Sequence, residues 1–183
     1  MGQHHRPVAG RHRADDLIVL TNEVRIVIPG HPAPKGSLKC IGGRGGRGHV
    51  LIEDNTRTKD WRHTVAMWVR NKWPTHQHAD QGQPVGAEIT FTLPRPKGHY
   101  RTGKNAHLLR DTAPLHPVGH STGDVDKLLR LALDALQDTD VLPDDCAVVE
   151  TSARKAYPRP VTAPDQLDDV LGYPGIAIRL YPI

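Results

Sequence analysis

The sequence predicts a single α/β domain, with a mixed β-sheet of about five strands and two main helices on one face. Three observations lead to this prediction. Residues 85–93 alternate between apolar and polar side chains, as a strand with one covered face does. Residues 58–73 and 127–137 carry apolar side chains at helical spacing. The expected order of elements, β-β-α-β-α-β-β, is typical of one α/β domain.

Composition limits the classes of protein that remain. The 183 residues can build one domain with a real core, but only 37% are hydrophobic, and 16 prolines and 17 glycines indicate long loops. The net charge of +4 and the pI of about 9.2 favour a polyanionic partner. Cys40 and Cys146 lack metal-ligand spacing and indicate a reducing compartment, and no apolar run reaches membrane-spanning length. We therefore expect a cytoplasmic protein.

The first third of the chain combines a tail, two strands and a basic loop. Residues 1–22 are polar, basic and without periodicity, which predicts a disordered tail before a domain of residues 23–183. Strands are expected at 24–28 and 49–52. Between them, residues 34–50 contain six glycines and no acid, which favours a flexible loop that contacts DNA phosphates or, alternatively, a solvated hairpin tip. The cations of this loop are Lys35, Lys39, Arg44 and Arg47.

The middle of the chain contains the longest loop. The helix at 58–73 places Trp61 and Trp68 on one stripe, where we expect core packing rather than base stacking. The loop at 94–122 follows the strand at 85–93 and ends beside Asp124, so its cations should surround an acidic site. The cations expected to contact DNA there are Arg95, Lys97, Arg101 and Lys104. Further strands are expected at 148–155 and around 176–180.

Residues 123–150 read GDVDKLLRLALDALQDTDVLPDDCAVVE and carry the predicted chemistry. Asp124 and Asp126 precede the helix at 127–137, with Asp126 as its expected N-cap. The helix is apolar on most sides, so we expect a sheet and a second subunit to cover it. Its polar stripe consists of Lys127, Arg130, Asp134 and Gln137.

A second acidic pair, Asp144 and Asp145, follows this helix. We expect the returning chain to bring one of them near Asp124 and Asp126. Several carboxylates at one place repel each other without a cation, and oxygen ligands of this kind suit Mg²⁺ or Mn²⁺. The plainer interpretation is a capping aspartate followed by an acidic turn.

The same stretch resembles the RusA-type Holliday junction resolvases, which are crossover junction endodeoxyribonucleases of bacteria and their phages. Their signature is D-x-D-N-x-x-K, then a hydrophobic helix with D-A-L, then D-D before a V-V strand. The matching residues here are Asp124-Val125-Asp126, Asp134-Ala135-Leu136, Asp144-Asp145 and Val148-Val149. Lys127 stands at the family's asparagine position and Arg130 at its catalytic lysine. Arginine stays protonated, so Arg130 cannot donate a proton near neutral pH.

The resemblance implies an activity and a set of roles. Asp124, Asp126 and Asp145 would bind Mg²⁺, and Asp144 is a further candidate metal residue or, alternatively, a capping or supporting group. Arg130 or Lys127 would neutralise the scissile phosphate. The implied protein is a homodimeric, magnesium-dependent nuclease that cuts branched DNA by paired, symmetric nicks in a bacterial cell or a phage-infected host. The alternative is a DNA-binding protein without enzymatic activity, whose acidic residues are structural.

Overall fold

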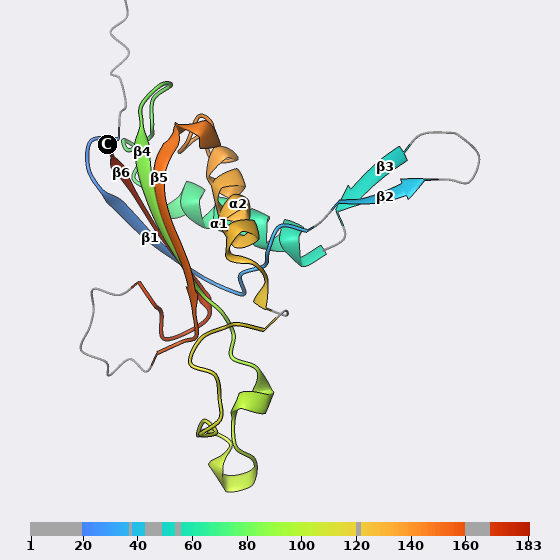
Figure 1. Cartoon of the computed structure of the whole chain (residues 1–183). Coiled ribbons are helices and arrows are strands. Elements are labelled where there is room, and N and C mark those ends of the chain that lie inside the picture. Colours follow the sequence, from blue (N-terminus) through green and yellow to red (C-terminus); the bar gives the residue numbers. More distant parts are fainter. Residues whose placement is uncertain (1–19, 37, 43–48, 54–55, 120–121, 160–168) are drawn as a thin grey trace, which may run out of the picture.

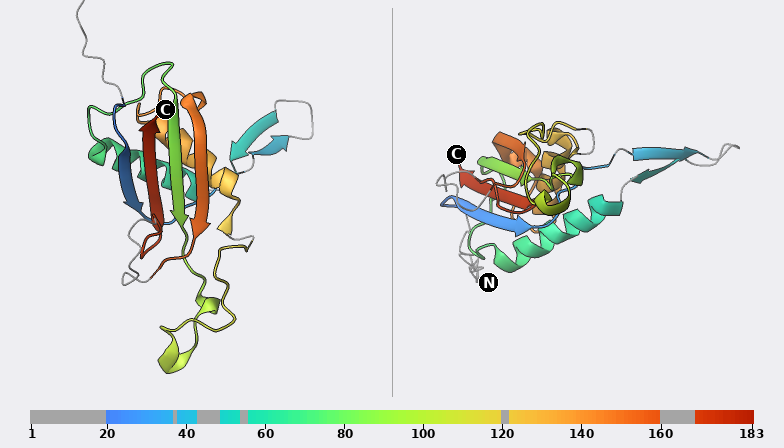
Figure 2. Two further views of the ribbon diagram at one scale, coloured as in Figure 1. Left: turned by 60° about the vertical axis from the view of Figure 1, so that its left-hand side comes forward. Right: turned by 90° about the horizontal axis from the view of Figure 1, so that it is seen from below.

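The computed structural model describes residues 20–36, 38–42, 49–53, 56–119, 122–159 and 169–183. Its body is a four-stranded sheet in the order β1-β6-β4-β5, with two helices packed against one face (Figures 1 and 2). The strands are β1 (Val24–Pro29), β6 (Gly175–Pro182), β4 (Val85–Thr92) and β5 (Val148–Ala156), and the helices are α1 (Thr56–Lys72) and α2 (Val125–Gln137). The predicted mixed α/β domain is confirmed.

The direction of the strands fixes the orientation of α2. β6 pairs antiparallel with both β1 and β4, whereas β5 pairs parallel with β4. Two parallel neighbours need a crossover, and α2 provides it. The N-terminal end of α2 therefore lies beside the C-terminal ends of β4 and β5. Its C-terminal end lies where β5 begins, as Figure 1 shows.

The second predicted strand does not join this sheet. β3 (His49–Glu53) pairs antiparallel with β2 (Leu38–Gly42), an element that the sequence did not predict. These two strands form a separate hairpin that extends from the body beside the start of α1 (Figures 1 and 2). The main sheet consequently has four strands rather than about five. The basic segment at 34–50 thus includes a hairpin, and its turn at 43–48 lies outside the described residues.

The core lies between the helices and the sheet. Its most deeply buried side chains are exposed by 1% or less and include Val65 of α1, Leu128 and Leu131 of α2 and Phe91 of β4. Trp61 is also buried, at 4% exposure, which confirms its predicted place in the core. Burial of this apolar surface is the main stabilising term of the fold.

The opposite face of the sheet is less open than predicted. Thr90 and Thr92 of β4 were expected on an uncovered face, but both are buried. The chain at 169–171 covers this part of the strand, and the backbone N–H of Leu171 donates to Oγ1 of Thr92 at 3.0 Å. Polar side chains on β4 are therefore compatible with burial because they receive hydrogen-bond partners.

The predicted tail overlaps the folded body at its end. Leu20 is 1% exposed, and the backbone N–H groups of Thr21 and Asn22 donate to the side-chain oxygen of Gln77. Residues 1–19 lie outside the described residues. Within the part of the chain that the structure describes, no helix has the length and apolarity needed to cross a membrane.

Candidate active site

The N-terminal end of α2 presents two acidic side chains to solvent. Asp124 is the N-cap, with φ −83° and ψ 142°, and Asp126 lies in the first turn. The prediction that Asp126 is the N-cap is wrong by two residues, because the helix already begins at Val125. The Asp124 carboxylate makes no capping hydrogen bond, and its Oδ2 lies 3.1 Å from Nζ of Lys127. Both carboxylates are exposed, so both are accessible to a ligand.

Tertiary contacts hold the turn that precedes α2. Gly123 has φ 72°, and a Cβ there would lie 2.8 Å from the Pro34 ring, so this position requires glycine. Nζ of Lys155, near the end of β5, donates to the backbone oxygen of Gly123 at 2.6 Å and to Oγ1 of Thr122 at 3.1 Å. Lys155 is thus a positioning residue for this turn. The sequence did not single it out, since its place along a strand does not tell which turn it reaches.

Two neighbouring positions on the polar stripe of α2 differ: Asp134 is engaged in an ion pair, and Arg130 is open to solvent. Oδ2 of Asp134 lies 2.6 Å from Nζ of Lys35, and this ion pair ties the proline-rich segment after β1 to α2. Lys35 was predicted to contact DNA, but here its charge is offset by a carboxylate. Arg130 is exposed and forms no hydrogen bond or ion pair with other described residues. It lies four residues after Asp126, which is one helical turn.

The second acidic pair belongs to the connection between α2 and β5. Asp144 caps the short 3-10 helix η4 (Asp145–Ala147), because its Oδ1 accepts the backbone N–H of Cys146 at 2.9 Å. The hydrogen bond from this N–H is the main reason that the pKa of Asp144 lies below its ordinary value, followed by side-chain hydrogen bonds with Cys146 and Asp145. Of the roles expected for Asp144, the structure shows the capping one. The Asp145 side chain is exposed.

The two acidic pairs lie at opposite ends of α2. The helix has 13 residues, which corresponds to a length of about 20 Å. The expectation that the returning chain brings Asp144 or Asp145 near Asp124 is therefore wrong for one chain. The physical reason is the crossover, because β5 begins beside the C-terminal end of α2. Among the described residues, no three histidine, cysteine or acidic side chains are close enough to hold a metal ion, so a single chain does not fit a three-carboxylate site.

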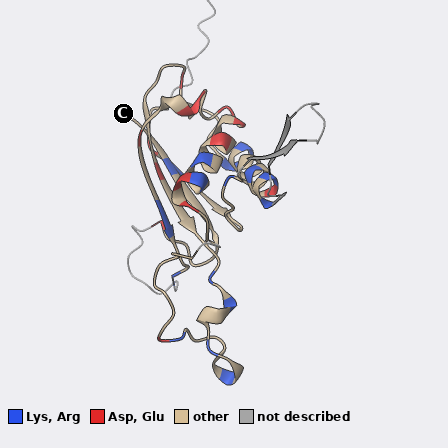
Figure 3. Cartoon of the chain, turned by 45° about the vertical axis from the view of Figure 1, so that its right-hand side comes forward, with Lys and Arg blue, Asp and Glu red and all other residues tan. Residues whose placement is uncertain are grey.

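Residues 94–119 of the predicted loop at 94–122 form an arm that extends beyond the sheet (Figures 1 and 2), and residues 120–121 lie outside the described residues. It contains the 3-10 helices η1 (Lys97–His99) and η2 (Gly103–Asn105) and a β-bridge between Tyr100 and Leu109. Lysines and arginines occur along the whole of the arm (Figure 3). The arm begins at the end of β4 and leads back to α2, so it lies on the side of the domain that carries Asp124.

The four arm cations predicted to contact DNA have different surroundings. The Arg95 guanidinium lies 4.1 Å from the centre of the Tyr157 ring and donates to the backbone oxygen of Pro114. Arg101 pairs with Asp111 at 2.9 Å. Lys97 and Lys104 are exposed and have no such partner in the described part of the chain. Two of the four cations therefore shape the arm, and two remain open to a ligand.

The remaining predicted DNA contacts lie in or near the β2–β3 hairpin. Lys39 is in β2, but its side chain is not among those described. Arg44 and Arg47 lie outside the described residues. Their role as phosphate contacts stays a prediction.

Comparison with known proteins gives one clear result. A family model described as endodeoxyribonuclease RusA matches residues 29–162, which is most of the chain. The match includes both acidic pairs, α1, α2 and the arm. No curated protein matches the sequence.

Proposed function

The chain belongs to the RusA endodeoxyribonuclease family, and from this premise we propose that it is a Mg²⁺-dependent nuclease that resolves four-way DNA junctions by paired, symmetric nicks. The family is one of nucleases that act on branched DNA. The observation that carries the proposal for this chain is the exposed pair of carboxylates, Asp124 and Asp126, at the end of α2 that adjoins a basic arm. Cations that bind phosphates beside carboxylates that bind a metal are what a nuclease needs.

We further propose that a second copy of the chain completes each site. Asp124 and Asp126 lie at one end of α2, whereas Asp145 lies beyond the other end. In a twofold dimer with the two α2 helices antiparallel, Asp145 of one copy would approach Asp124 and Asp126 of the other. Twofold symmetry makes two such sites, which matches two nicks in opposing strands.

The metal would be Mg²⁺, with Mn²⁺ as a substitute, since the donors are carboxylate oxygens. In phosphodiester hydrolysis such an ion supplies an activated water and offsets negative charge. The chain's own cations would act on the phosphate. Arg130 is exposed one turn from Asp126, so it can neutralise the scissile phosphate. Lys127 is paired with Asp124, and we assign it the orientation of that carboxylate.

A nicking assay tests the proposal. The substrate is a synthetic four-way junction, incubated with the protein in Mg²⁺ or in EDTA, with a linear duplex of the same sequence as the control. We expect symmetric nicks in the junction only when Mg²⁺ is present. A protein that binds the junction equally well in both buffers, but never nicks it, would instead be a DNA-binding protein whose acidic residues are structural.

A further inference from the structure

Helix α1 is the most basic element of the body outside the candidate site. Its 17 residues contain five lysines and arginines and one acidic residue. The side that faces the core carries Trp61, Val65 and Val69, all buried. The basic residues therefore lie on the outer side of the helix and along its border with α2. They are Arg57, Lys59, Arg62, Arg70 and Lys72.

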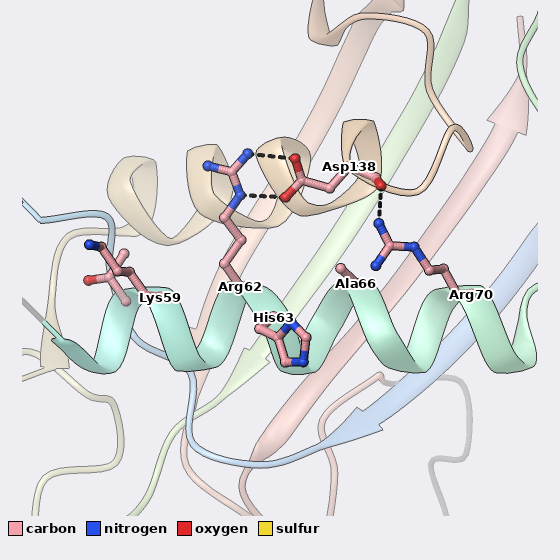
Figure 4. A pocket seen from close by; sticks show the side chains of 7 residues that line it. Lys59, Arg62, His63, Ala66, Arg70 and Asp138 are labelled. Atoms are coloured by element: carbon pink, nitrogen blue, oxygen red, sulfur yellow. Dashed lines mark hydrogen bonds and ion pairs between the residues drawn. The ribbon is translucent and has the colours of Figure 1, made fainter.

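A hollow of about 440 Å³ lies along this border. Ala66 forms part of its lining, and its small side chain leaves the space open, since Arg62 and Arg70 stand one turn before and one turn after it. Both arginines reach from α1 to Asp138 at the C-terminal end of α2 (Figure 4). Lys59 and His63 complete the cationic and polar lining.

The charge in the hollow is not balanced. Asp138 is the one acidic residue among its lining side chains, and Arg62 already pairs with it at 2.6 and 2.8 Å. Arg70 donates to the backbone oxygen of Asp138 rather than to a carboxylate. Lys59 and His63 are exposed and make no hydrogen bond or ion pair within the described residues. An anion that enters the hollow would therefore meet uncompensated positive charge from Lys59 and Arg70.

The hollow is also well placed for DNA that occupies the candidate site. Asp138 and Asp126 are twelve residues apart along α2, which corresponds to about 18 Å. One DNA strand rises 3.4 Å per nucleotide, so this distance spans about five nucleotides. Along this distance, Arg130 of α2 adds an exposed cation.

We propose that this hollow binds the phosphate backbone of a DNA arm about five nucleotides from the cut made at Asp124 and Asp126 of the same chain. The proposal rests on the proposed function. In it, Lys59 and Arg70 contact phosphate, His63 adds a hydrogen bond, and Arg62 joins the two helices through Asp138. The hollow has no base-reading role in this proposal, since phosphate contacts position the protein without carrying sequence information.

The test compares Lys59→Gln with Lys72→Gln. Both lysines are exposed residues of α1, but only Lys59 lines the hollow. Binding of a four-way junction is measured by fluorescence anisotropy at several salt concentrations. Loss of one phosphate contact should lower the slope of log affinity against log salt by about 0.9. We expect this change in Lys59→Gln, a roughly doubled change in Lys59→Gln/Arg70→Gln, and almost none in Lys72→Gln. Equal changes in Lys59→Gln and Lys72→Gln, or no change in either, would overturn the proposal.

Ethylation interference separates this proposal from the proposed function. In the parent protein, ethylated phosphates about five nucleotides from the nick should weaken binding, and in Lys59→Gln this interference should disappear. A purely structural role of the hollow would leave the pattern unchanged. If the parent binds the junction but does not nick it, the proposed function fails. The salt slopes then still decide whether DNA occupies the hollow.

Discussion

The two ends of α2 carry similar acidic residues, but these residues make different contacts. At the N-terminal end, Asp124 is the N-cap, yet its carboxylate makes no capping bond, and Asp126 is exposed beside it. At the other end, Asp144 accepts a backbone hydrogen bond and holds the short helix that leads into β5. A carboxylate that accepts a hydrogen bond from the local backbone has a structural role that accounts for it. A carboxylate that makes no such bond and is exposed, as at Asp124 and Asp126, remains accessible to a ligand from outside the chain.

The difference also shows why the carboxylates of one chain cannot form a three-carboxylate metal site by themselves. A crossover helix between parallel strands necessarily separates the residues before it from the residues after it. Asp124 and Asp145 are therefore held apart by the length of α2, however close the family signature places them in the sequence. Three questions can be tested by mutation: whether the N-terminal pair is functional, whether the pairs of two copies combine, and whether Asp144 is structural.

The largest effect is expected from the N-terminal pair. Asp124→Asn or Asp126→Asn removes a proposed metal ligand and should slow junction cleavage by about 100-fold or more. Junction binding should stay intact or become tighter, because the change removes negative charge near the phosphates. Gel shift and nicking of the same four-way junction measure both quantities.

Asp140→Asn is the matched control for this experiment. Asp140 is exposed near the other end of α2, and its φ of 60° is a conformation that asparagine accepts readily. The same chemical change at this position should leave nicking close to the parent rate. Near-normal nicking by Asp126→Asn would refute the site, and an equal loss in Asp140→Asn would show that the assay reports net charge.

Mixing two inactive variants tests whether the two ends combine between copies. Asp126→Asn and Asp145→Asn should each be inactive alone. If each site takes Asp126 from one chain and Asp145 from the other, a mixed dimer contains one intact site and one site with both changes. We expect the mixture to regain single nicks, at up to about half of the parent rate per dimer because one of the two sites is intact, but not paired resolution. No recovery after the two chains have been shown to exchange would place each site within one chain.

Arg130 should give an intermediate effect. A charge-assisted hydrogen bond contributes about 1.5–3 kcal/mol, so Arg130→Ala should lower single-turnover nicking by about 10-fold or more. Arg130→Lys keeps the charge and should retain much of the rate. A slow Lys127→Ala together with a normal Arg130→Ala would move the phosphate-neutralising role to Lys127.

The sequence predicted the sheet and the helices well because their patterns are local. Alternation along β4 and helical spacing in α2 are properties of neighbouring residues, so they can be recognised without the fold. The missed strand β2 shows the limit. Its residues lie in a glycine-rich basic segment, and only pairing with β3 gives them a strand conformation. Pairing between segments is not visible in the periodicity of either one.

The sequence proposes the residues of the candidate site but not their geometry. The spacing of Asp124, Asp126 and Asp145 was recognisable, whereas their separation follows from strand direction, which the sequence does not state. Lys155 was missed for the same reason, since its contact with Gly123 joins elements 32 residues apart. The basic hollow beside α1 was also missed, because it requires α1 and the end of α2 to meet.

The smallest effect concerns Asp144 and depends on pH. Its pKa is lowered from an ordinary value of 3.8, mainly by the hydrogen bond from the Cys146 backbone. A carboxyl group with a lowered pKa in the folded state stabilises the fold above its ordinary pKa, and this contribution is lost as the pH falls through the lowered value. Asp144→Asn keeps a capping oxygen but no charge, so its Tm should be about 2 °C or less below the parent at pH 7, and the difference should shrink as the pH falls through the lowered pKa. Asp144→Ala loses the cap itself and should be less stable than the parent both at pH 7 and in acid. In contrast with Asp145→Asn, Asp144→Asn should retain most of the nicking activity. A Tm difference between Asp144→Asn and the parent that does not shrink as the pH is lowered through the acidic range would show that the charge of Asp144 does not contribute to the turn.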